Sequence, residues 1–228
     1  QGKKSGLPHR KSAGRSQHRM LGGAQGFRQD IRRRSQVFPG GILLKLKSPL
    51  DEKTVRSLTI GDIVHLDGPI ITGRDEIHIR ALRMARAGEE VPEEIYDSVL
   101  YHCGPIMIEE NGKWIPVAAG PTTSARMDSL TPEMIETFRI KAIIGKGGMS
   151  SEVAEAMKKH GCVYLAAVGG TAVTLAEGLG ESTGAYWKDL GMAEAIWKFD
   201  TDNFGPLTVA IDAKGGNLYE EVRRNIKR

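Results

Sequence analysis

The chain has 228 residues, a length typical of one domain with an appendage, and its core should need neither disulfide bonds nor a structural metal. Two cysteines, Cys103 and Cys162, are too few for a disulfide framework or an iron–sulfur cluster held by this chain alone. No apolar run approaches the roughly 18 residues of a transmembrane helix, and no apolar signal segment follows the basic N-terminus. We therefore expect a cytoplasmic protein without a membrane partner.

Positive charge is concentrated at the N-terminus. Residues 1–40 carry ten Lys and Arg against one acid, Asp30, whereas residues 41–228 carry 22 basic and 27 acidic residues. This composition predicts a flexible basic arm over 1–40, in which Gln1-Gly2 resembles the remnant of a trimmed tag. Contact with nucleic acid or a membrane surface is one interpretation of the arm. A solvated arm or a subunit-docking arm is the favoured explanation, and nucleic acid is not our expected partner.

From residue 41 onward, short β-prone runs alternate with capped helices, which predicts a single mixed α/β domain over 41–228. Asn111-Gly112 between two β-prone runs is typical of a hairpin, so part of the sheet should be antiparallel. The predicted strands cover 42–47, 62–66, 98–101, 106–109, 114–118, 141–144, 162–168 and 207–212.

Helix start and stop signals predict four helices. One covers 74–87 and ends at Gly88, and one covers 132–139, with Thr131 before it and Pro132 at its first position. A third, over 151–160, has Ser150 as N-cap and Gly161 after its end. The last covers 217–227.

Glycine-rich turns follow two predicted strands, Gly145-Lys146-Gly147-Gly148 and Gly169-Gly170. Ligands of open α/β sheets bind at such strand ends, because helix N-termini and free amides meet there. Neither turn matches a nucleotide-binding motif, since Gly147 stands where a phosphate-binding loop needs Ser or Thr, and no Gly-x-Gly-x-x-Gly occurs. Tight turns alone explain these glycines as well.

Three turns each carry a cation or hydroxyl that packing does not require. They supply Arg74, Arg126 and Lys146. Two guanidinium groups and an ammonium suit a small substrate with two carboxylates, because Arg binds a planar carboxylate with two parallel hydrogen bonds. Three unrelated surface cations are the alternative. His78 lies one helical turn after Arg74 and Asp75, so it can face the same pocket.

Over residues 42–228 the sequence resembles the β subunit, or C-terminal domain, of class I iron–sulfur fumarases and the related L-tartrate dehydratases. The resemblance rests on an ordered series of short motifs: Gly73-Arg74-Asp75 with His78, Gly120-Pro121-Thr122-Thr123 with Arg126-Met127-Asp128, Ile144-Gly145-Lys146-Gly147-Gly148, Gly161-Cys162-Val163-Tyr164-Leu165, Gly169-Gly170, Glu194-Ala195-Ile196-Trp197, and Phe204-Gly205-Pro206 leading to Ile211-Asp212.

The resemblance implies a swivelling β/β/α domain of three layers, with mixed parallel and antiparallel sheets. It implies substrate-binding roles for Arg74, Arg126 and Lys146, and proton abstraction by Thr122 from the carbon next to a carboxylate. Asp75, His78 and Thr123 resemble supporting groups. The sequence departs from the family pattern at Glu76-Ile77, where small residues are common, and in its basic arm.

The implied activity is hydration of fumarate to L-malate, with L-tartrate dehydration as the alternative. The resemblance places a [4Fe–4S] cluster on an α subunit, in an assembly such as α2β2, and assigns no metal to this chain. A Thr hydroxyl is a weak base near neutral pH and needs activation. Asp75 and Asp128 are local candidates for this, whereas the resemblance points to an Asp on the partner.

Two other classes of function stay open on the sequence alone. One is an α/β module that binds a nucleotide or another small molecule through its glycine turns. The other is a nucleic-acid adaptor that binds through the basic arm, which would give its affinity a steep salt dependence.

Overall fold

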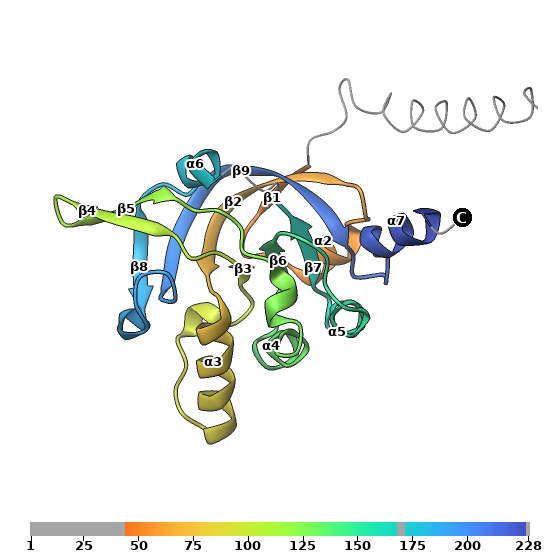
Figure 1. Ribbon diagram of the computed structural model, residues 1–228, viewed down its shortest axis with the longest axis horizontal. Coiled ribbons are helices and arrows are strands. Elements are labelled where there is room, and N and C mark those ends of the chain that lie inside the picture. The colour runs from red at the N-terminus through yellow and green to blue at the C-terminus, as the bar shows by residue number, and fades with distance from the viewer. Residues whose placement is uncertain (1–43, 168–171, 227–228) are drawn as a thin grey trace, which may run out of the picture. The chain divides into compact units, whose positions relative to one another are not determined.

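A computed structural model describes residues 44–167 and 172–226 of the chain (Figure 1). The predicted basic arm, the start of the first strand, the Gly169-Gly170 turn and residue 227 lie outside these residues. The strands are β1 (Leu44–Lys47), β2 (Ile63–Thr72), β3 (Val99–Tyr101), β4 (Ile106–Glu110), β5 (Lys113–Ala118), β6 (Ala142–Gly145), β7 (Val163–Ala166), β8 (Ser182–Tyr186) and β9 (Ile196–Ile211).

The helices of the described part are α2 (Glu52–Ser57), α3 (Asp75–Ala87), α4 (Thr131–Phe138), α5 (Ser151–His160), α6 (Ala172–Glu177) and α7 (Leu218–Ile226), with 3-10 turns η1 (Glu93–Ile95), η2 (Ser124–Met127) and η3 (Lys188–Leu190). Within residues 44–167 and 172–226, none has the length and apolar character needed to cross a membrane.

The main sheet combines parallel and antiparallel pairing. Strands β1, β2, β3, β6 and β7 run parallel in that order, and β9 runs antiparallel to β7, β8 and β2. Because β9 pairs with both β2 and β7, the strands β2, β3, β6, β7 and β9 form a closed ring of hydrogen-bonded neighbours. Figure 1 shows β9 arching across the sheet between β2 and β7.

Strand alternation divides the buried side chains into two cores. Tyr101 of β3 and Ile144 of β6 belong to a cluster between the strands of the ring, whereas Leu100 and Ile143 belong to a second cluster with helix residues such as Phe138. Helices α3, α4 and α5 lie together on this second side (Figure 1). The predicted α/β class with mixed sheets is confirmed, and the three-layer arrangement and the single domain over 41–228 stay predictions.

Local signals in the sequence located several element ends. Gly88 and Gly161 adopt left-handed conformations after α3 and α5, and the Ser150 side chain accepts a hydrogen bond from the Val153 amide. The predicted hairpin is confirmed as β4–β5, with positive φ at both Asn111 and Gly112. This hairpin forms its own two-stranded sheet, and its exposed apolar residues include Ile106, Ile108 and Val117.

Other elements differ from the predictions. The strand predicted over 62–66 continues to Thr72, and the one predicted over 207–212 is only the end of β9. Both longer strands contain a Gly-Pro pair, Gly68-Pro69 and Gly205-Pro206, which reads as a turn in the sequence but lies within the strands here. Helices α2 and α6 and strand β8 were not predicted, since each is short and lacks a long periodic pattern.

We expect Gly68→Ala to destabilise the fold more than Gly61→Ala. Both glycines have positive φ, which costs an alanine about 1–2 kcal/mol. A Cβ at Gly68 would also lie 2.5 Å from the Ser48 carbonyl oxygen, whereas nothing lies within 4 Å of a Cβ at Gly61. Urea denaturation of both variants measures the difference in free energy of unfolding. Equal losses would show that the strand absorbs the close approach of Ser48.

Candidate functional site

Part of the predicted site follows the carboxyl ends of adjacent parallel strands, with Arg74 after β2 and Lys146 after β6. Thr72, the last residue of β2, pairs with Tyr101 of β3, and Tyr101 pairs with Ile144 of β6. The chain then leaves the strands through Arg74, His102 and Lys146. We call these strand ends and the loops that follow them the site edge. Ligands commonly bind where parallel strands end, in open sheets and in closed ones, because free amides and helix N-termini meet there.

Arg74 lies at the start of α3, next to the carboxylate of Glu194 and to Gly104. Its Nε lies 3.3 Å from Glu194 Oε1, and both side chains are about one-fifth exposed. A Cβ at Gly104 would lie 2.7 Å from both Cδ and Nη1 of Arg74, so this glycine leaves the space that the guanidinium occupies. Glu194 also accepts a hydrogen bond from the Glu76 amide, at 3.3 Å, in the first turn of α3.

Arg126 belongs to η2 and contacts the first residue of α3. Its Nη2 lies 2.8 Å from Asp75 Oδ2, and half of the Arg126 side chain is exposed. Each of the two expected carboxylate-binding arginines therefore already has a carboxylate neighbour from this chain. These partly exposed pairs contribute little stability, and their effect is to orient the guanidinium groups.

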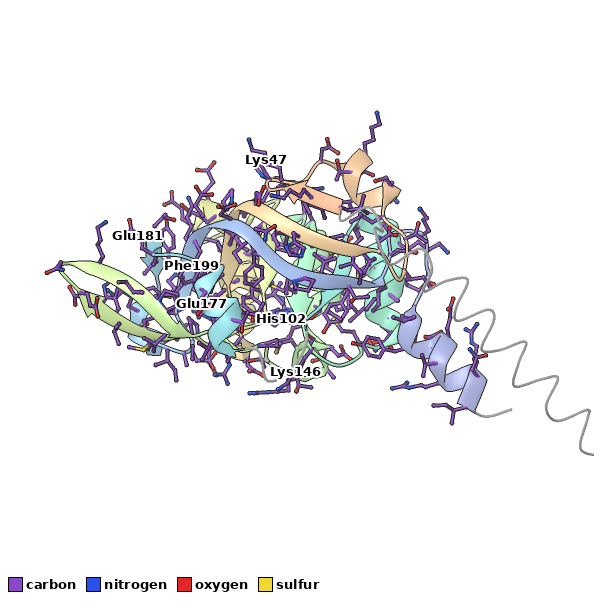
Figure 2. The ribbon with its side chains drawn as sticks, turned by 90° about the horizontal axis from the view of Figure 1, so that it is seen from above. Lys47, His102, Lys146, Glu177, Glu181 and Phe199 are labelled. Carbon is purple, nitrogen blue, oxygen red and sulfur yellow. The ribbon has the colours of Figure 1, made fainter. Side chains whose placement is uncertain are left out.

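Thr122, Thr123 and Lys146 come from two loops that run side by side. Thr123 and Lys146 form a parallel β-bridge, and the Lys146 amide donates to the Thr122 carbonyl at 3.2 Å. Thr122 is partly buried, whereas Thr123 and Lys146 are exposed. Figure 2 shows Lys146 extending outward from one face of the chain, with His102 further inside.

His78 and His102 form a buried pair behind these loops. Both side chains are fully buried, and their ring centroids lie 5.2 Å apart in an edge-to-face arrangement. His78 Nδ1 lies 2.8 Å from the Arg74 carbonyl oxygen, and His102 Nδ1 lies 2.9 Å from Ser124 Oγ. Burial lowers the pKa of His78 and lowers the pKa of His102 still further, and both imidazoles are therefore neutral near pH 7.

Neither local candidate for activating Thr122 hydrogen-bonds to it. Asp75 pairs with Arg126, and Asp128 accepts a hydrogen bond from the Ser150 amide at 3.0 Å. Burial raises the pKa of the Asp128 carboxyl above its ordinary value. Within the described residues, the structure thus brings Asp75 to Arg126 and leaves Thr122 without a carboxylate at its hydroxyl.

Thr123, Arg126 and Lys146 of the site edge are exposed to solvent. A cavity of about 170 Å³ lies elsewhere, at residues that include Ser48, Pro69, Tyr96, Ser98 and Lys198. An open edge suits a domain whose site is completed by another body, and it does not by itself enclose a substrate.

Comparison with known proteins gives the family. A family profile described as Fumarase C-terminus matches residues 28–222. A putative L(+)-tartrate dehydratase subunit beta from Methanocaldococcus jannaschii is 45% identical over 178 residues, which cover 78% of this chain and 91% of that protein. This chain belongs to the fumarase C-terminus family.

Two further relatives show the range of this family. The L(+)-tartrate dehydratase subunit beta of Escherichia coli K12 is 34% identical over 78% of this chain and 88% of that protein. A putative class I fumarate hydratase from Geobacillus stearothermophilus is 36% identical over 80% of this chain. The match covers only 35% of that longer protein, so this chain corresponds to one part of it.

Sequence reasoning missed several residues of the site edge. Glu194 stood in a recognised motif but had no predicted role, and Gly104, Ser124 and Tyr164 had none either. His102 had no predicted role either. One signal was available for His102, since it follows directly after the strand predicted over 98–101, as Gly145-Lys146 follows the strand predicted over 141–144.

The two cysteines lie in different buried clusters, Cys103 in the first and Cys162 in the second. Both are free thiols and form no disulfide bond. Burial raises the pKa of the Cys103 thiol to about 12 and raises that of Cys162 as well. The described residues contain no group of three His, Cys, Asp or Glu side chains arranged to hold a metal ion.

We expect the fold to lose stability as the pH falls from about 7.5 to about 5. The buried histidines have lowered pKa values, so below about pH 6.5 the unfolded chain binds protons that the folded chain does not. Each such proton removes about 1.4 kcal/mol of stability per pH unit.

Urea denaturation at several pH values measures this loss. His102→Asn removes one of the two titrating groups, so the stability of this variant should fall less steeply with pH than that of the unmodified chain. An equal slope in both proteins would show that His102 does not contribute to the pH dependence.

Proposed function

We propose that this chain is the β subunit of a hydro-lyase that acts on a four-carbon dicarboxylate. The observation that carries the proposal is the meeting of Arg74, Arg126, Lys146 and Thr122 at one strand edge in a member of the fumarase C-terminus family. The reaction removes water from a hydroxy diacid, or adds it to the double bond of the unsaturated acid.

We propose two candidate substrates, in order of preference. Reversible hydration of fumarate to L-malate is our first candidate, and the relative named as a class I fumarate hydratase supports it. Dehydration of L-tartrate is the second, because two relatives with long shared coverage are named as L(+)-tartrate dehydratase subunit beta. Both substrates present two carboxylates, which matches the two arginines.

The arginines are proposed to bind and orient these carboxylates. Glu194 contacts Arg74 at Nε, and Asp75 contacts Arg126 at Nη2, which fixes one side of each guanidinium. The other donors of each group then face the substrate. As the C3 proton leaves, negative charge grows on the adjacent carboxylate, and a positioned guanidinium stabilises this charge more strongly than it stabilises the ground state.

Thr122 is proposed to take the C3 proton, and Lys146 to hold the substrate beside it. The amide of Lys146 donates to the carbonyl of Thr122, so the two side chains start from neighbouring backbone positions. The hydroxyl needs a base that neither Asp75 nor Asp128 provides, because Asp75 pairs with Arg126 and Asp128 accepts from the Ser150 amide. We therefore propose that a carboxylate of the partner activates Thr122.

The partner is proposed to be a cluster-bearing α subunit, in an assembly such as α2β2. The word "subunit" in the names of two relatives supports a partner for this chain as well. A [4Fe–4S] cluster on that partner would supply the Lewis acid for the departing hydroxyl. The buried, neutral thiols of this chain are consistent with that division.

Reconstitution tests the proposal directly. The chain is expressed alone and together with its candidate α subunit, and both preparations are reconstituted anaerobically with iron and sulfide. Hydration of fumarate and dehydration of L-malate and L-tartrate are then measured. We expect turnover only in the assembled protein. Turnover by the isolated chain, or none with any of these diacids in a cluster-loaded assembly, would refute the proposal.

Arg126→Ala should lower kcat and raise KM in the assembled enzyme. Loss of a charged hydrogen-bonding group in a closed site costs on the order of 2–4 kcal/mol in kcat/KM. Arg126→Lys should recover little, because an ammonium cannot form two parallel hydrogen bonds. Arg139→Ala is the matched control, since Arg139 is also half exposed and ion-paired, at 2.6 Å from Asp97. Equal kinetics for both alanine variants would remove Arg126 from the site.

Thr122→Val should reduce kcat by roughly 10²-fold or more, because it removes a proton-transfer group while keeping the side-chain volume. Thr122→Ser should keep part of the activity. Thr54→Val, a partly buried threonine in α2, is the control. Exchange of the C3 hydrogen of the hydroxy acid into deuterated water reports proton abstraction separately from turnover. Exchange at the unmodified rate in Thr122→Val would contradict the assigned role.

A further inference from the structure

A chain of three buried polar side chains lies beneath the site edge. Tyr164 of β7 donates its hydroxyl hydrogen to Ser124 Oγ at 3.0 Å, and Ser124 Oγ lies 2.9 Å from His102 Nδ1. All three side chains are fully buried. We call Tyr164, Ser124 and His102 the buried polar chain.

The two outer groups of the buried polar chain are both neutral. Burial raises the pKa of the Tyr164 hydroxyl and lowers that of His102, so both groups are neutral. Tyr164 donates to Ser124, and the hydroxyl hydrogen of Ser124 is then free to point at His102 Nδ1. His102 Nε2 has no hydrogen-bond partner among the described residues.

The backbone of the buried polar chain holds the loops that carry Thr122 and Lys146. The His102 carbonyl accepts a hydrogen bond from the Thr122 amide at 2.7 Å, and the Ser124 amide donates to the Lys146 carbonyl at 3.1 Å. The His102 amide donates to the Ile144 carbonyl at 2.8 Å, which ties the same residue to β6. His102 and Ser124 thus connect by side chain to each other and by backbone to both loops.

Gly145 supplies the space for this arrangement. A Cβ at this position would overlap Ser124 Oγ and lie 3.1 Å from the Tyr164 hydroxyl. Its φ is not positive, so a tight turn does not explain the glycine. The space that a side chain would fill is occupied by the hydroxyls of Ser124 and Tyr164.

We propose that Tyr164, Ser124 and His102 are positioning residues that set Thr122 and Lys146 in the arrangement needed for catalysis. Burial removes the hydrogen bonds that these three polar groups would form with water. Hydrogen bonds among the groups replace them only when the side chains lie in this arrangement, which makes the arrangement specific. The catalytic part of this inference rests on the proposed function. The positioning of the two loops rests only on the contacts described above.

Two substitutions at His102 separate positioning from packing. In His102→Asn the side-chain amide reaches the place of Nδ1 and can keep the bond to Ser124. In His102→Gln it reaches the place of Nε2 and cannot, although glutamine fills more of the space. We expect kcat of the assembled enzyme to fall roughly 10²-fold in His102→Gln and clearly less in His102→Asn, since displacement of reacting groups by about 1 Å has effects of that size.

KM should change much less than kcat in both variants, because the arginines still bind the carboxylates. A purely structural role predicts the opposite order, with glutamine tolerated better than asparagine. His65 is the matched control, because it is also buried and its Nδ1 lies 3.1 Å from a backbone oxygen, that of Asn203. His65→Asn and His65→Gln should leave kcat unchanged.

Gly145→Ala gives a second, independent test. The added methyl overlaps Ser124 Oγ, so this variant should lose both thermal stability and kcat. In Gly145→Ala/Ser124→Ala the overlap with Ser124 Oγ is gone, and the nearest remaining neighbours of the new methyl are the Tyr164 hydroxyl at 3.1 Å and Ser124 Cβ at 3.4 Å. The double variant should recover the melting temperature of Ser124→Ala but not the lost kcat. Recovery of kcat together with stability would overturn the proposal.

Amide hydrogen exchange of the full chain tests the inference without an activity assay. Ser124→Ala should accelerate exchange in peptides that cover 119–127 and 145–149, and His65→Asn should not. Unchanged exchange in Ser124→Ala overturns the positioning role, whatever the kinetics. Accelerated exchange in a chain whose assembled, cluster-loaded form turns over none of the diacids would instead refute the proposed function and leave the positioning of the loops intact.

Discussion

Main-chain hydrogen bonds continue the parallel register one residue beyond the ends of the strands. The Gly73 amide donates to the Tyr101 carbonyl at 2.9 Å, and the His102 amide donates to the Ile144 carbonyl at 2.8 Å. These two bonds fix where the chain leaves β2, β3 and β6. Each residue proposed for binding or proton transfer lies in a loop that begins at the end of β2, β3 or β6, or in a loop that contacts one of these. The geometry of the site therefore depends on backbone pairing before it depends on any side chain.

Charge at the site edge is arranged in pairs rather than as a bare positive patch. Arg74 faces Glu194 and Arg126 faces Asp75, and the part of the chain after the basic arm is acidic overall. A neutralised edge attracts anions weakly from a distance, so recognition of a diacid has to come from the directed hydrogen bonds of the guanidinium groups at short range. Such a site favours selectivity for carboxylate geometry over simple negative charge.

Local signals were sufficient to predict part of this structure. Capping residues and the Asn111-Gly112 turn located α3, α5 and the β4–β5 hairpin, because each depends on neighbours in sequence. The length of β2 and β9 could not be predicted in this way. Their Gly-Pro pairs lie inside strands only because the two strands pair with each other through bulges, and that pairing joins distant parts of the chain.

The residues of the candidate site could likewise be predicted only in part. Arg74, Arg126 and Lys146 could be predicted because cations in glycine-rich turns are conspicuous in the sequence. Glu194, Ser124 and Tyr164 could not, since each matters only through a contact made across strands, such as the one between Tyr164 and Ser124. A glycine such as Gly145 gives no hint in sequence that it makes room for a hydroxyl of another loop.

The pairing of β9 with β2 also affects how this chain folds while it is being synthesised. Ile63 pairs with Thr208 and Ile71 with Lys198. One edge of β2 therefore stays unpaired until β9 has been synthesised. On the ribosome, β2 and β7 keep unpaired edges until residues 196–211 have emerged, and unpaired edges bind other strands. Contacts between such distant residues also form slowly. Because the ring of β2, β3, β6, β7 and β9 closes only after β9 has been made, synthesis is the stage at which the chain most needs protection from association.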